Sequence, residues 1–155
     1  DNDKETNISN IIKNKYNMDI FIDENYKIIK NDKNFLWIGR GYPYRWLVFN
    51  KGKLGNKSIY KDLIIDTFEE KLTNVNIPDK YVKFDSNNSN FIVHGLYEQL
   101  DSDTGGPFFT YIFEDYENNE VIFVSGFVNN PGKKKADLVL QLETIIKNIE
   151  VLNYE

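Results

Sequence analysis

The chain of 155 residues contains no cysteine, and this absence removes several kinds of chemistry. Without a thiol there is no disulfide, no thiolate nucleophile and no cysteine-ligated zinc or iron–sulfur centre. Histidine occurs once, so a zinc site would need carboxylates for almost all of its ligands. We therefore expect no metal and no cofactor. The lack of cysteine does not choose between an oxidising and a reducing compartment.

Long apolar runs are also missing. None approaches the roughly 20 residues that cross a bilayer, so we expect no transmembrane segment here. The sequence opens without a secretory signal, so any signal or lipid anchor would have been removed or would lie outside these residues.

An excess of positive charge is the third absence. The formal net charge is −5, whereas nucleic-acid binding needs clustered cations that face phosphates. The only dense basic run, Lys133-Lys134-Lys135, is short and stands where a helix should begin. We expect no nucleic-acid partner.

Apolar and aromatic residues are abundant, at 41% and 15% of the chain. A chain of this length buries roughly 70% of the surface that its unfolded form exposes. We predict a single α+β domain over residues 1–155, with the polar residues 1–6 frayed.

The first part of the chain shows a helical spacing and then β-rich runs. Apolar residues recur at helical spacing from Ile8 to Tyr16. Two strands within residues 18–40 should meet at a tight turn over 30–33, because Asn31 and Asp32 tolerate positive φ. A third strand follows over 44–52. The next helix spans residues 56–72, with Asn56 or Ser58 as its N-cap.

The second part predicts four strands and a closing helix. The strand ranges are 80–84, 90–100, 107–116 and 120–128, and the segment 85–90 should form a hairpin turn. The last two strands are apolar at nearly every position, as in central strands that are covered on both faces. After Pro131-Gly132, a helix presents Leu138, Leu142, Ile145 and Ile149 on one face. The order α-βββ-α-ββββ-α predicts a mostly antiparallel sheet of about six or seven strands flanked by helices.

The stretch Gly105-Gly106-Pro107 raises the question of a phosphate loop. Such a loop opens a helix, whose free N–H groups meet the anion, but this stretch precedes a strand. The G-x-G at Gly39 and Gly41 is likewise followed by a strand, so it is not a dinucleotide fingerprint. We predict that Gly105, Gly106 and Pro107 form a structural turn that needs positive φ or close backbone approach, with Pro107 starting the strand.

The acidic residues before these glycines resemble the start of a calcium loop. Asp101, Asp103 and Gly106 occupy its first, third and sixth positions, but Gly105 and Ile112 stand where further oxygen ligands belong. We expect a solvated acidic turn, and a weak alternative is a metal-dependent module around Asp101 and Asp103.

Catalytic patterns are sparse. His94 alternates with apolar residues in a strand, which favours a partly buried structural histidine. Ser125 lies in V-S-G-F, which lacks the G-x-S-x-G elbow. The adjacent pairs Glu114-Asp115 and Glu69-Glu70 point in different directions, so they indicate surface charge. A hydrolase using Ser125 or a carboxylate with His94 stays open as an alternative.

One short segment concentrates the residue types of binding sites. Both tryptophans and both arginines of the chain lie within ten residues. Trp, Tyr and Arg are favoured at binding hot spots, so a flat aromatic patch with two guanidiniums at its rim is our candidate site for a ligand or partner. The cluster comprises Trp37, Arg40, Tyr42, Tyr44, Arg45 and Trp46. The alternative is that one tryptophan belongs to the core and the arginines to ordinary surface.

The C-terminal part resembles a known family in four features. They are Gly95-Leu96-Tyr97, the strand start at Gly105 to Phe108, the turn Gly126-Phe127-Val128 with Pro131, and Leu142-Glu143 with Ile145-Ile146. The segment Phe35 to Arg40 is similar to an F-x-W-x-R strand. Together they resemble DUF4837, a domain-of-unknown-function family of Bacteroidetes lipoproteins. Tyr97 and Thr104 depart from the family's Trp and Met.

The resemblance implies more about location than about chemistry. It covers the C-terminal half of the family's proteins, and it implies an exported, lipid-anchored parent in the cell envelope or periplasm. It brings no catalytic residues. The element order is also similar to the PsbP/Mog1 architecture, which transfers no function. Our leading hypothesis is a non-catalytic, extracytoplasmic domain that binds a partner protein or small ligand, or packs against the other half of its parent.

Overall fold

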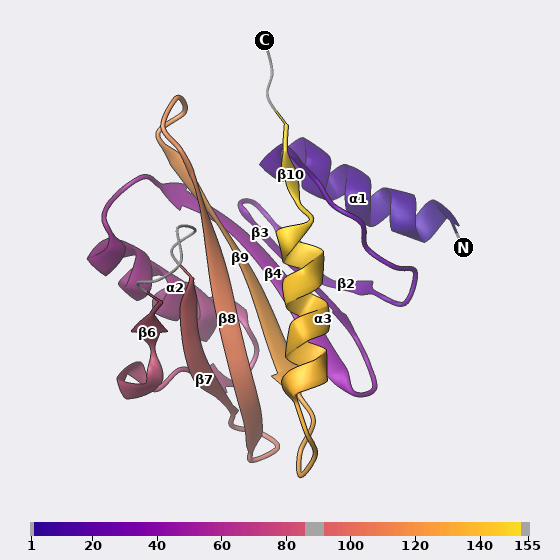
Figure 1. Cartoon of the computed structure of the whole chain (residues 1–155), viewed down its shortest axis with the longest axis vertical. Coiled ribbons are helices and arrows are strands. Elements are labelled where there is room, and N and C mark those ends of the chain that lie inside the picture. The colour runs from indigo at the N-terminus through magenta and orange to yellow at the C-terminus, as the bar shows by residue number, and fades with distance from the viewer. Residues whose placement is uncertain (1, 86–91, 153–155) are drawn as a thin grey trace.

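The computed structural model describes residues 2–85 and 92–152. Helices pack against one large antiparallel sheet in this part of the chain (Figure 1). The helices are α1 (Asn2–Tyr16), α2 (Lys57–Lys71), α3 (Ala136–Lys147) and the short 3-10 helix η1 (Asp79–Tyr81). The strands are β1 (Met18–Asp19), β2 (Lys27–Asp32), β3 (Phe35–Arg40), β4 (Tyr44–Lys53), β5 (Val75–Asn76), β6 (Lys83–Phe84), β7 (Val93–Gln99), β8 (Thr104–Asp115), β9 (Glu120–Asn129) and β10 (Glu150–Val151).

The large sheet has the strand order β2-β3-β4-β9-β8-β7-β5, and β6 also pairs with β7. All of its pairings are antiparallel. The predicted α+β class and antiparallel sheet are therefore confirmed. The described residues give eight strands in this sheet rather than six or seven, because the short strands β5 and β6 both add to β7. A separate two-stranded sheet joins β1 to β10.

Two hydrophobic cores lie on opposite faces of the sheet. Side chains of α1 and α3 join the core of one face, which includes Ile12, Leu36 and Leu142. Side chains of α2 join the core of the other face, which includes Phe68, Phe108 and Phe127. In Figure 1, α3 crosses the front of the sheet. β8 and β9 contribute to both cores, so the prediction of central strands covered on both faces is confirmed.

The helices form where apolar spacing predicts them. α1 already begins at Asn2, within the stretch that we expected to be frayed. The Asn56 side chain accepts a hydrogen bond from the backbone N–H of Ile59 at 3.0 Å, so Asn56 is the N-cap of α2. In α3, Leu142 and Ile146 are fully buried.

One turn and one strand differ from the prediction. β2 continues through Asp32, and the turn falls on Lys33 and Asn34, because Asn34 takes the positive φ of 63°. The first predicted strand of the second half is short, since η1 occupies part of residues 80–84. The predicted hairpin turn over 85–90 falls almost entirely on residues 86–91, outside the described residues.

The predicted turn at Gly105, Gly106 and Pro107 is wrong. These residues lie inside β8 and pair with Glu98, Tyr97 and Leu96 of β7. The acidic turn ends just before them, at Asp103 with φ of 52°.

The two glycines are required for close backbone approach, not for positive φ. A Cβ on Gly105 would lie 2.2 Å from the Tyr97 carbonyl oxygen, and one on Gly106 would lie 2.1 Å from that of Val128. Pro107 is tolerated because the pairing of β8 with β9 begins only at Phe108.

Candidate functional site

The two tryptophans lie on the same face of neighbouring strands. Trp37 pairs with Val48 and Trp46 pairs with Gly39, and both indoles join the core beneath α2. Their rings meet edge to face with centroids 4.9 Å apart. Trp37 is buried, and Trp46 is half-buried against Phe127. The tryptophans therefore pack in the core and do not form a flat exposed patch.

The two arginines point to the opposite face. Arg40 and Arg45 are cross-strand partners at the end of the β3–β4 hairpin. Adjacent residues of a strand alternate between faces, so Arg45 cannot share a face with Trp46. The predicted patch with two guanidiniums at its rim does not form. Tyr44 remains half-exposed, and its ring contacts that of Tyr42.

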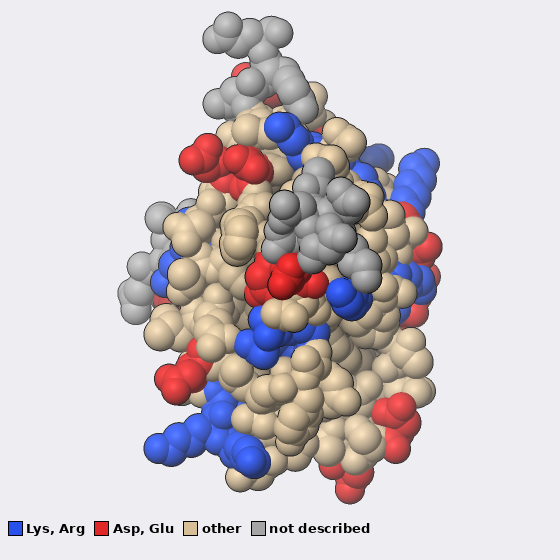
Figure 2. Space-filling model, turned by 90° about the vertical axis from the view of Figure 1, so that its right-hand side faces the viewer, with Lys and Arg blue, Asp and Glu red and all other residues tan. Residues whose placement is uncertain are grey.

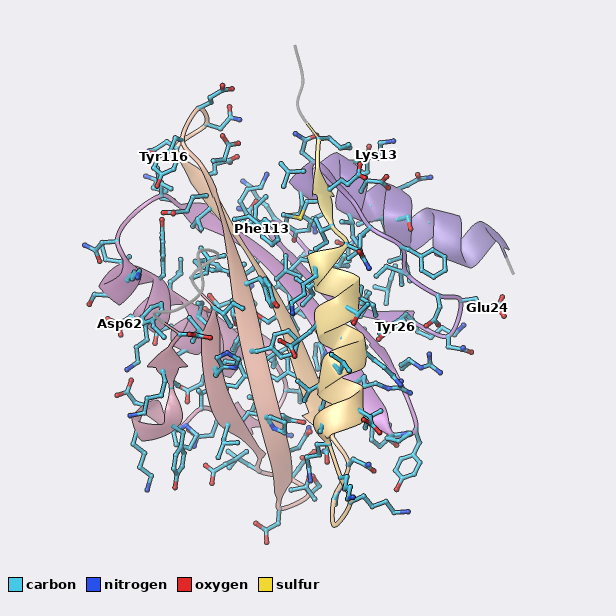
Figure 3. The ribbon with its side chains drawn as sticks, in the orientation of Figure 1. Lys13, Glu24, Tyr26, Asp62, Phe113 and Tyr116 are labelled. Atoms are coloured by element: carbon cyan, nitrogen blue, oxygen red, sulfur yellow. The ribbon has the colours of Figure 1, made fainter. Side chains whose placement is uncertain are left out.

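The arginines instead line a groove on the face beneath α3. The groove has a volume of about 630 Å³. Its walls come from the β3–β4 hairpin, the segment before β2, and α3, and Figure 3 shows Tyr26 beside α3. The lining residues are Asp23, Tyr26, Arg40, Arg45, Asp137, Leu140, Gln141, Thr144 and Ile145.

Arg45 is the most enclosed cation of the groove, with 8% of its surface exposed. Its Nη1 donates to Gln141 Oε1 at 2.5 Å, and its Nε donates to the Pro43 carbonyl oxygen at 3.3 Å. Both acceptors are neutral. Burial and the neighbouring Arg40 lower the pKa of Arg45 from its ordinary value, although an arginine keeps its charge at neutral pH.

Arg40 has a carboxylate partner. Its Nη1 donates to Asp23 Oδ2 at 2.9 Å, and its guanidinium lies 5.8 Å from the centroid of the Tyr26 ring. Its Nε is buried and has no hydrogen-bond partner in the part of the chain that the structure describes. Burial raises the pKa of Tyr26 to about 12, so this phenol is neutral at physiological pH.

Figure 2 shows lysine and arginine side chains intermingled with aspartate and glutamate on the side of the molecule at the right of Figure 1. Over the described residues, no helix has the length and apolar character that a bilayer crossing requires.

Ser125 and His94 lie on opposite faces of the sheet. Ser125 is fully buried, and its Oγ lies 2.7 Å from the hydroxyl of Thr110, which belongs to the face beneath α2. His94 alternates with Val93, which faces that same core, so the imidazole points to the other face. His94 is exposed, not partly buried as predicted, and its cross-strand neighbours are Lys83 and Phe109. The sheet therefore separates the serine and the histidine.

Two of the carboxylates have structural roles. Glu69 accepts a hydrogen bond from the backbone N–H of Ile77, and Glu114 accepts one from the Tyr60 hydroxyl at 2.7 Å. Asp101 accepts a hydrogen bond from Asn74, at the acidic turn that the sequence predicts. The described residues contain no group of three or more histidine, aspartate or glutamate side chains placed to hold a metal ion.

The sequence patterns identified two residues of the groove, Arg40 and Arg45, as candidate site residues and did not identify the others. Asp23 and Tyr26 come from an irregular segment, and Gln141 and Thr144 come from the solvent-facing side of α3. None of these residues stands in a motif. The sequence did contain one signal for the arginine pair. Alternation along a strand places Arg45 and Trp46 on opposite faces, and a hairpin that turns between Gly41 and Tyr44 pairs Arg45 with Arg40.

Solved structures share this fold. A mutant of protein Mog1 matches with a TM-score of 0.58 at 8% identity, over 88% of this chain and 92% of that one. The Saccharomyces cerevisiae Ran-binding protein Mog1p matches with the same TM-score and identity, over 88% and 91%. At this identity the likeness shows the fold alone, and it confirms the predicted Mog1-like architecture. A search of curated proteins finds no match.

The family assignment comes from the sequence between Asn56 and Asn148. These residues, which run from the N-cap of α2 to the end of α3, match the family described as Domain of unknown function (DUF4837). The matched segment spans more than half of the chain and contains every C-terminal motif noted above. The chain belongs to the DUF4837 family.

Proposed function

We propose that this domain is a non-catalytic binding module, and that the groove between α3 and the β3–β4 hairpin is its binding site for a small ligand or a projecting side chain of a partner protein. The observation that carries the proposal is the convergence of four side chains with spare hydrogen-bonding capacity on one groove. They are Tyr26, Arg40, Arg45 and Gln141.

The size and composition of the groove support binding. Ligand sites are concave, largely preformed, and combine apolar walls with a few polar groups that fix orientation. Leu140 and Ile145 supply apolar wall, and the guanidiniums supply oriented donors. The sheet separates Ser125 from His94, which favours binding over hydrolysis by this pair. Mog1p, described as Ran-binding, illustrates that a fold of this kind serves binding.

We also propose that the domain acts outside the cytoplasm, as part of a lipid-anchored envelope protein. The support is the resemblance of its motifs to Bacteroidetes lipoproteins. Metabolic labelling of the full-length protein with palmitate tests this. Label that disappears when an upstream cysteine is replaced supports anchoring, and an unlabelled protein in the cytoplasmic fraction contradicts it.

A groove-filling variant tests the binding site. Candidate ligands are screened by ¹⁵N–¹H NMR, with the amides of Gln141 and Thr144 as reporters. Thr144→Trp puts an indole into the groove and should weaken any hit at least about tenfold. The matched control is Thr73→Trp, at an exposed position after α2, which should leave affinity unchanged. Hits that bind Thr144→Trp as tightly as the wild type contradict the proposal.

A further inference from the structure

We propose that the groove recognises an oxyanion, the carboxylate or phosphate group of its ligand, and that Arg45 and Arg40 hold this group between them. The proposal rests on the proposed function and adds the chemical class of the ligand.

The first argument is the unneutralised charge of Arg45. A buried cation is costly unless a counterion and hydrogen bonds compensate for its lost hydration. Arg45 has two neutral acceptors, and among the described residues it has no carboxylate within ion-pair distance. Neither of its bonds uses Nη2. The guanidinium therefore has a free donor in the groove and lacks a negative partner, which a ligand oxyanion would supply.

The second argument is the pairing of two like charges. Arg40 stands directly opposite Arg45 across the β3–β4 hairpin, where like charges destabilise each other. Asp23 is the one carboxylate that contacts this pair within the described residues, and it contacts Arg40 alone. The two guanidiniums therefore share a single contacting carboxylate, and Arg45 has none in contact among the described residues. Burial and, after it, the charge of Arg40 lower the pKa of Arg45, while Tyr26 and Asp23 act in the opposite direction.

The third argument concerns geometry. A guanidinium offers parallel N–H donors that match the two oxygens of a carboxylate or phosphate. Cross-strand neighbours have Cβ atoms about 5 Å apart, so one small oxyanion can contact both guanidiniums.

The remaining charged residue of the groove limits what can bind. Asp137 lines it but forms no ion pair with either arginine in the described part of the chain. It lies in the first turn of α3, where a carboxylate is stabilised by the helix dipole. With Asp23 and Asp137 at its sides, the groove should favour a single oxyanionic group and reject a polyanion such as nucleic acid.

The chain permits a direct experiment, because Arg40 and Arg45 are its only arginines. Their side-chain Nε–H signals can be followed by ¹⁵N–¹H NMR while sodium phosphate, acetate or succinate is added at constant ionic strength set with sodium chloride. We expect saturable shifts of both signals with phosphate or with a carboxylate. The small probes should bind with affinities on the order of millimolar. Which probe saturates first distinguishes a phosphate site from a carboxylate site.

Three variants sharpen the result. Arg45→Gln should weaken oxyanion binding at least about tenfold. Asp23→Asn should strengthen it several-fold, because Arg40 loses its competing carboxylate. That gain does not depend on whether Arg45→Gln folds. Lys133→Gln, in the exposed basic run, is the control and should bind like the wild type.

The contrary outcomes are distinct. Shifts that grow linearly with concentration, or that are the same in Arg45→Gln and the wild type, overturn the oxyanion assignment and indicate an adventitious ion only. If a neutral compound binds the groove and is blocked by Thr144→Trp while no oxyanion binds, the binding module stands and the oxyanion inference falls. If Thr144→Trp blocks the binding of no ligand, the proposed function itself is contradicted.

Discussion

The face of the sheet beneath α2 and the face beneath α1 and α3 differ in what they bury. Beneath α2, Phe127 contacts the rings of Trp46, Phe68, Tyr97 and Phe108, with centroids 4.9 to 5.8 Å apart. Thr110 and Ser125 satisfy each other at 2.7 Å within that core. Beneath α1 and α3 the core is richer in isoleucine and leucine, and the hairpin arginines border it.

This difference indicates that one face of the sheet serves stability and the other serves binding. The α2 face is aromatic and the hydroxyls within it have partners, so its residues serve stability. The α3 face ends in a groove with a buried cation, Arg45, that forms no ion pair with any described residue, which is a cost to stability that a binding role would explain. Substitutions on the first face should therefore affect unfolding, and substitutions in the groove should affect binding.

The largest expected effect is from Phe127→Ala. It removes the ring that connects four other aromatic side chains, and should lower the free energy of unfolding by about 3–5 kcal/mol. Urea unfolding measures the loss. Phe21→Ala is the matched control, because Phe21 is 75% exposed and its removal should change stability by less than about 0.5 kcal/mol. Equal losses would contradict the assignment of stability to the aromatic face.

The buried hydroxyl pair should show strong coupling. Ser125→Ala leaves the Thr110 hydroxyl unsatisfied and should cost about 1–3 kcal/mol. Thr110→Val combined with Ser125→Ala removes both hydroxyls and should cost less than the sum of the single changes. A double-mutant cycle by urea unfolding gives the coupling. Strict additivity would show that the two hydroxyls do not depend on each other.

Tyr26 connects the groove to alkaline stability. Its folded pKa of about 12 exceeds the unfolded value of about 10, so the unfolded state releases its proton first. The stabilisation that neutral Tyr26 gives the folded state is fully present below pH 10, and it is lost as the pH rises from about 10 to 12. Tyr26→Phe should make the alkaline decline of the melting temperature less steep. An unchanged slope would show that Tyr26 ionises equally in both states.

The smallest expected stability effect is from Arg45→Met. Replacing a buried charge by an apolar side chain of similar length is often neutral or stabilising, so the change should be within about 1 kcal/mol. The same variant should lose binding of any oxyanion at the groove. Thermal unfolding and the NMR titration measure the two properties. A large destabilisation with intact binding would reverse the proposed roles of the two faces.

Much of the fold could be predicted from local patterns. Helical spacing placed α1, α2 and α3, and the apolar runs placed β8 and β9 at the centre of the sheet. The errors come from effects that local patterns do not carry. Gly105 and Gly106 stand in a strand because two carbonyl oxygens pass close to them, and that closeness depends on Tyr97 and Val128. The groove depends on α3 packing over the β3–β4 hairpin, which joins residues about 100 positions apart along the chain, as in the Arg45–Gln141 hydrogen bond.

The segment that matches the family contains only part of this structure. Residues 56–148 include α2, α3 and the strands β5 to β9, but they exclude β2, β3 and β4. Both arginines of the groove lie outside the matched segment. The matched segment therefore contains the α3 wall of the groove, and the β3–β4 hairpin that carries the guanidiniums precedes the matched residues.

The pairing of β4 with β9 has a consequence for how the polypeptide reaches its native state. β2, β3 and β4 follow one another closely along the chain, as do β7, β8 and β9, so each group can pair early through short loops. The two groups join where Lys53 of β4 pairs with Glu120 of β9. These two residues are far apart along the chain, and closing so long a loop is slow. Until the two groups join, β9 presents an unpaired, apolar edge to other chains. Refolding should therefore compete with aggregation, and its yield should fall as protein concentration rises.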